Sequence, residues 1–172
     1  MKIRLKKHPD ASASITCTRR DGSVTWQRQR GQLGVVFPPH DLTHYAVETT
    51  LGYRRGFYGL LASGWEIADF AKPWPRGAIP PEAAEVEQII GVFDAERRQF
   101  ARWTAEEFAS HARSYVAARA ATKHEVAMTP RILTQDEIEA VRTRRDELLA
   151  NWHALRAGEE MVLDFGGDEA SC

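Results

Sequence analysis

The sequence predicts an α+β domain in which a small antiparallel sheet packs on about four helices, with a histidine-rich helix at the centre. Three observations predict this class. Alternating apolar residues flank an Asp-Gly pair near the N-terminus, long stretches with helical periodicity follow, and one more apolar run lies near the C-terminus. With 172 residues, 43% of them hydrophobic, the chain can bury a core. We expect residues 1–165 to form a single domain and residues 166–172 to be a flexible acidic tail.

The first predicted element is a hairpin centred on Asp21-Gly22. An Asp-Gly pair suits a two-residue type I′ turn between two strands. That turn places Cys17 opposite Trp26, so that the apolar side chains of both strands share one face, which we expect to be buried. The residues of this face are Ile15, Cys17, Val24 and Trp26.

Three other segments read as extended chain. Residues 1–7 alternate and predict a third strand, and residues 161–165 predict a C-terminal strand that joins the hairpin in one sheet. Residues 33–37 alternate as well, and they predict a short extended segment that leads into Pro38-Pro39.

Helices are predicted for most of the remaining chain. The proline pair favours a helix that begins near His40 and runs to about Leu61. Within it a stripe of glycines, Gly52, Gly56 and Gly59, would allow close packing against another element or form a groove. A second helix is expected from Pro81 to Ala101, and capping boxes that begin at Thr104 and Thr134 open two more.

Charge is unevenly distributed along the chain. Residues 1–30 contain eight Lys or Arg against two Asp, whereas the whole chain has a formal net charge of −1. A solvated sheet face explains these charges, so we do not expect nucleic-acid binding. The alternative would need four arginines to project together with an exposed aromatic residue. These are Arg19, Arg20, Arg28 and Arg30.

Location and redox state follow from what the sequence lacks. No apolar run approaches the roughly 18 residues of a membrane span, and the first residues lack the apolar stretch of a signal peptide. We therefore expect a cytoplasmic protein with no membrane partner. Cys17 and Cys172 have no metal-binding spacing and are expected to be free thiols.

The strongest chemical signal follows the proline pair. On a helical wheel with His40 at zero, His44 lies at about 40°, Glu48 at about 80° and Asp41 at about 100°, so all four share one face. Two imidazoles at i and i+4 with a carboxylate one turn further predict a divalent-metal site whose ligands are His40, His44 and Glu48. A ligand from elsewhere remains an alternative, and the candidates are His111, His124, Glu66 and Asp69.

His40-Asp41-Leu42-Thr43-His44 resembles the HExxH helix of the zincin metallopeptidases over these five residues. The resemblance implies a metal held by the two histidines, with Asp41 at the position of the catalytic base that activates a water molecule. It favours a metal-dependent hydrolase that uses Zn or another divalent metal. Arg55, at about 60° on the same wheel, is the candidate for binding an anionic substrate.

Two interpretations without a metal remain open, a structural role of the histidines and metal-free acid–base catalysis. His40 could hydrogen-bond at the helix start while His44 pairs with Glu48, and the helices would then serve a protein partner or a homo-oligomer. The chain as a whole, including residues 59–65, also resembles a group of small uncharacterised bacterial proteins, and this resemblance implies no activity.

Overall fold

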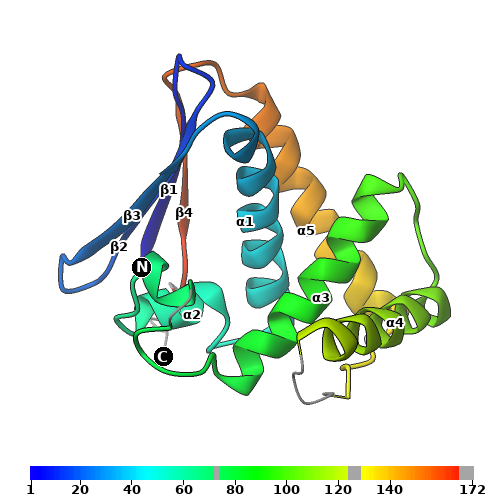
Figure 1. The fold of residues 1–172 in the computed structure, drawn as a ribbon. Helices are drawn as coiled ribbons and strands as arrows, with labels where there is room; N and C mark the ends of the chain where they lie inside the picture. Colours follow the sequence, from blue (N-terminus) through cyan, green and yellow to red (C-terminus); the bar gives the residue numbers. More distant parts are fainter. Residues whose placement is uncertain (72–73, 124–128, 167–172) are drawn as a thin grey trace, which may run out of the picture.

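A four-stranded antiparallel sheet forms one layer of the protein (Figure 1). The computed structural model describes residues 1–71, 74–123 and 129–166. The strands lie in the order β3-β2-β1-β4, and their bounds are β1 Lys2–Lys7, β2 Ala13–Thr18, β3 Val24–Gln29 and β4 Glu160–Asp164. The α+β class and the pairing of the C-terminal strand with the N-terminal strands are therefore confirmed. Most of the expected tail, residues 167–172, lies outside the described residues.

The helices form the second layer and lie on one face of the sheet (Figure 1). They are α1 Gln32–Leu51, α2 Phe57–Ala62, the short 3-10 helix η1 Ile67–Phe70, α3 Pro81–Arg98, α4 Ala105–Lys123 and α5 Gln135–Ala154. Helix α1 is central, because it contacts the sheet as well as α2, α3 and α5. Both predicted capping boxes are present, with reciprocal hydrogen bonds between Thr104 and Glu107 and between Thr134 and Glu137.

The hairpin has a different register from the predicted one. Cys17 pairs with Thr25, and Thr16 pairs with Trp26. The loop holds three residues rather than two, because the Gly22 N–H donates to the Arg19 carbonyl and Gly22 adopts a φ of 84°, as in a turn closed by a left-handed residue. A shift of one residue turns every side chain of β3 to the other face. Trp26 is therefore 65% exposed rather than buried.

The central helix begins earlier and ends earlier than predicted. Residues 33–37 are helical rather than extended, and the helix continues through both prolines. Proline in a helix interior removes a hydrogen bond and normally breaks the helix, yet Pro38 and Pro39 are buried in this chain. Tertiary packing therefore outweighs their local cost.

A left-handed glycine ends this helix. Gly52 has a φ of 74°, and its N–H and that of Tyr53 both donate to the Glu48 carbonyl. The chain then reverses, and α2 follows as a separate short helix. The three glycines consequently do not form a stripe on one helix, because Gly52 caps α1, Gly56 precedes α2 and only Gly59 lies inside a helix.

An ion pair is buried where α3, α4 and α5 meet. Glu96 and Arg142 are each 1% exposed, and the Arg142 guanidinium bonds both carboxylate oxygens of Glu96 as well as the Trp103 carbonyl, at 2.6 Å. The Trp103 N–H donates to the same carboxylate at 2.9 Å. Paired and fully hydrogen-bonded, these charges fix the helices relative to one another.

Candidate metal centre

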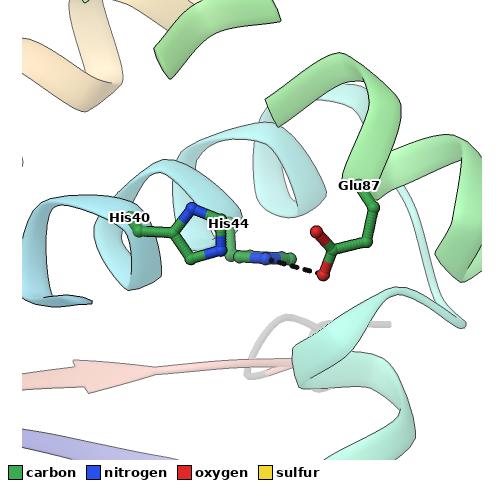
Figure 2. Close-up of side chains that lie close together, drawn as sticks. All are labelled: His40, His44 and Glu87. Atoms are coloured by element: carbon green, nitrogen blue, oxygen red, sulfur yellow. Dashed lines mark ion pairs between the residues drawn. The ribbon is translucent and has the colours of Figure 1, made fainter. Parts of the chain in front are cut away.

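Two histidines of α1 and one glutamate of α3 converge on a common point (Figure 2). His40, His44 and Glu87 each offer one ligand atom, and these atoms all lie within 4.8 Å of one another. The i, i+4 spacing brings the two imidazoles together on one helix face, with ring centroids 4.8 Å apart. Packing of α3 against α1 supplies the carboxylate.

Each imidazole also contacts a second carboxylate through its other nitrogen. His40 Nδ1 lies 2.9 Å from Asp94 Oδ2, and His44 Nδ1 lies 3.4 Å from Glu48 Oε1. An ionised carboxylate can only accept, so each Nδ1 must carry the proton. Both Nε2 atoms are then the positions at which a metal would bind, an arrangement that metal-bound histidines almost always show.

The charges around the two histidines differ. Burial opposes the imidazolium form of His44, but the adjacent carboxylates of Glu87 and Glu48 outweigh it and raise the pKa of His44 to about 10. Burial also opposes ionisation of Asp94, yet the hydrogen bond and charge of His40, with help from Arg97, lower the pKa of Asp94. The centre is thus rich in negative charge, which suits a cation.

Glu48, the expected third ligand, lies on the Nδ1 side of the His44 ring. Its carboxylate accepts the N–H groups of Tyr58 and Gly59, each at 3.2 Å, at the start of α2. The carboxylate that joins the two histidines is instead Glu87, whose Oε1 lies 3.2 Å from His44 Nε2. Sequence reasoning missed Glu87 because it lies on another helix, and no local spacing links it to α1.

The other two predicted site residues lie in different surroundings. Asp41 is buried on α1, and this burial raises its pKa to about 6, against the opposing charges of His40 and His44. Arg55 does not lie on the histidine face, because the helix ends at Leu51. Its side chain is exposed, and its backbone N–H donates to Glu82 at 2.6 Å.

The alternative third ligands are not part of this group. His111 stacks on Trp103, Glu66 pairs with Arg19, and Asp69 pairs with Arg76. His124 lies outside the described residues.

A pocket of about 300 Å³ opens beside the centre. His40 and Glu87 form part of its wall, Phe37 gives it an apolar side, and Arg98 and Tyr115 are among its other lining residues. Because two of the three converging side chains line it, a ligand in this pocket would reach the point on which they converge.

Comparison of the chain with protein-family models, curated proteins and solved structures gave no match. Within the part of the chain that the structure describes, no helix has the length and apolarity required to cross a membrane.

Proposed function

We propose that this protein binds a divalent metal ion through His40 Nε2, His44 Nε2 and a carboxylate oxygen of Glu87, and that the bound ion serves hydrolysis. Zn²⁺ is the ion that we favour, because two imidazoles and one carboxylate are the ligands of known catalytic zinc sites. Such sites keep one position for water or substrate.

One observation carries the proposal: three potential ligand atoms from two helices lie within 4.8 Å of one another, and a carboxylate orients each imidazole from its far side. An ion pair alone would explain the contact between His44 and Glu87. An ion pair does not explain why His40 lies beside His44 and Glu87, with its Nδ1 hydrogen-bonded to Asp94. Both outer contacts favour metal binding at Nε2.

The pocket supports a catalytic role over a purely structural one. A structural zinc site is closed by four protein ligands, whereas this group has three and borders a pocket. Arg98 lines that pocket, and we assign it, in place of Arg55, to an anionic group of the substrate. Asp41 remains the proposed general base, because it follows His40 on α1 and the charges of both histidines act on its carboxylate, whose pKa burial raises to about 6.

Metal binding is tested first by elemental analysis of protein purified without an affinity tag. Titration with Co²⁺ then reports coordination directly, because visible absorption bands appear when Co²⁺ enters a low-symmetry site. We expect one ion per chain, and loss of binding in His40→Ala, His44→Ala and Glu87→Gln. His153→Ala and Glu147→Gln change exposed residues outside the centre and should bind normally.

Hydrolysis is tested separately with p-nitrophenyl acetate and bis(p-nitrophenyl) phosphate as probes. Asp41→Asn should retain the metal and lose turnover. The proposal would be refuted if the unmodified, folded protein bound no metal. It would also be refuted if folded His40→Ala and His44→Ala variants bound metal as well as the unmodified protein does. If the protein binds metal but hydrolyses neither probe, the proposed metal site is supported. The proposal that the site hydrolyses carboxylic esters or phosphodiesters is then contradicted.

A further inference from the structure

The outer face of the sheet, which is the face turned away from the helices, combines basic side chains with an exposed tryptophan. Directly paired residues of neighbouring strands point to the same side, and the register pairs Trp26 with Thr16 and Thr16 with Arg4. The alternate residues Ile3, Leu5 and Cys17 are buried on the inner face. Trp26 therefore shares the outer face with the basic residues of β1.

The basic residues of β1 are regularly spaced. Lys2, Arg4 and Lys6 alternate along the strand, so neighbouring members are about 7 Å apart and point in one direction. Successive phosphates of an extended nucleic-acid strand are separated by a similar distance. Trp26 lies two strands away, about 10 Å from this row, which leaves room for a nucleotide sugar and base between the row and the indole ring.

Most of these charges are available to a ligand. Lys2 and Lys6 lie opposite the exposed Asp164 and Glu160 of β4, but within the described ranges neither lysine forms an ion pair. Arg4 has only a contact of 3.8 Å with the half-exposed Glu160. Arg28, beside Trp26 on β3, pairs with Asp10 at 2.9 Å. Exposed pairs of this kind contribute about 0–1 kcal/mol, so a phosphate can replace either carboxylate.

The aromatic residue is equally accessible. Trp26 is 65% exposed, and it takes part in none of the ring contacts found among the described aromatic residues. Arg4 and Thr16 separate it from the exposed Val162. Val24, two residues before Trp26 on β3, shares the face and is 49% exposed. The two side chains form a small apolar patch, which the basic row borders and which is smaller than the patches on which hydrophobic partners dock.

We propose that the outer face binds single-stranded nucleic acid, with the phosphates along Lys2, Arg4 and Lys6 and one base stacked on Trp26. The ligand is single-stranded because a base within a duplex is already stacked on its neighbours and cannot cover the indole ring. This binding is independent of the metal centre, which lies between α1 and α3 on the other side of the sheet.

The test is fluorescence anisotropy with fluorescein-labelled ten-nucleotide oligothymidylate and oligouridylate, and with a ten-base-pair duplex, in EDTA at 50 mM salt. We expect both single strands to bind more tightly than the duplex. Trp26→Ala should weaken binding about 5- to 150-fold, because stacking on one aromatic side chain has that effect, whereas Trp26→Phe should retain most of it. Trp26 is exposed, so the variants should fold, which circular dichroism verifies.

Charge is tested by a matched pair of double variants. Lys2→Ala/Lys6→Ala should reduce the slope of log affinity against log salt by about 1.4, since each phosphate contact of a single strand contributes about 0.7. Arg113→Ala/Arg156→Ala removes the same charge from exposed positions off the sheet and should leave the slope unchanged.

Preference for RNA or DNA identifies the source of the ligand, and either preference supports the proposal. No binding to either strand at 50 mM salt, equal binding by Trp26→Ala, or tighter binding to the duplex would each overturn it. Displacement of the oligonucleotide by polyglutamate at equal charge concentration would show that the face binds anions without selectivity. This result would also overturn the proposal.

Discussion

His44 Nε2 lies 3.2 Å from Glu87 Oε1, and this contact joins α1 to α3. Without a metal His44 is protonated at neutral pH, because its pKa is raised to about 10 by Glu87 and Glu48, against the effect of burial. A proton therefore occupies the atom through which His44 would bind a metal. Metal and proton compete for one position.

This competition predicts that metal affinity rises with pH. His44 must release its Nε2 proton before the metal binds, and the cost of that release falls as pH approaches 10 from below. Between pH 6.5 and 8.5 we expect roughly tenfold tighter binding per pH unit. Calorimetric titration in buffers of different ionisation enthalpy should show release of about one proton per ion. An affinity that does not change over this range would contradict the ligand assignment.

The outer carboxylates should tune affinity without being ligands. Asp94→Asn keeps an acceptor for His40 Nδ1 but removes the charge, and Glu48→Gln does the same for His44. We expect each to weaken metal binding about 10- to 100-fold, measured by competition with a chromophoric chelator. Glu147→Gln, in an exposed pair with Arg144, is the control. Complete loss of binding in Glu48→Gln in a folded protein would identify Glu48 as a ligand after all.

The buried pair of Glu96 and Arg142 should be essential to stability. Glu96→Ala leaves the Arg142 guanidinium buried, at 1% exposure, without its main partner. Loss of one member of such a pair costs about 3–5 kcal/mol of the free energy of unfolding, measurable in urea. The exposed pair of Arg144 and Glu147 serves for comparison, and Glu147→Ala should cost about 0–1 kcal/mol. If both variants lost similar amounts of unfolding free energy, the buried pair of Glu96 and Arg142 would not be the stabilising contact that we infer.

Gly56 should tolerate no side chain, because a Cβ there would lie 2.5 Å from Glu48 Cδ. Gly56→Ala must push the Glu48 carboxylate away from the start of α2, and we expect a loss of about 1–3 kcal/mol. Thermal unfolding measures it. If the clash is the cause, the loss should shrink when Glu48→Ala is already present. An additive double variant would place the cause elsewhere.

The strands and the capped helices could be predicted from sequence because their signals are local. Alternation of apolar residues marks β1, β2 and β4, and the capping boxes at Thr104 and Thr134 open α4 and α5. The register of β3 depends on whether the loop at Gly22 has two residues or three, and the Asp-Gly pair predicted the wrong length and therefore the wrong register. The helix through Pro38 and Pro39 depends on burial that no local pattern reports.

The metal centre could be predicted only in its α1 half. His40 and His44 are found by their spacing, since both lie on one helix. Glu87 and Asp94 come from α3, and the crossing of α3 over α1 decides which of its carboxylates face the histidines. Helix crossing is a property of the packed fold, so the sequence offered Glu48 as the nearest carboxylate.

The place of β1 between β2 and β4 affects how the protein is made. β1 leaves the ribosome well before its second partner, β4, because the five α-helices that the structure describes lie between the two strands in the chain. Until β4 emerges, one edge of β1 remains open, and an open edge can recruit the strand of another chain. A ribosome that stalls before Glu160 would thus release a product with an exposed β1 edge, prone to pair with its own copies.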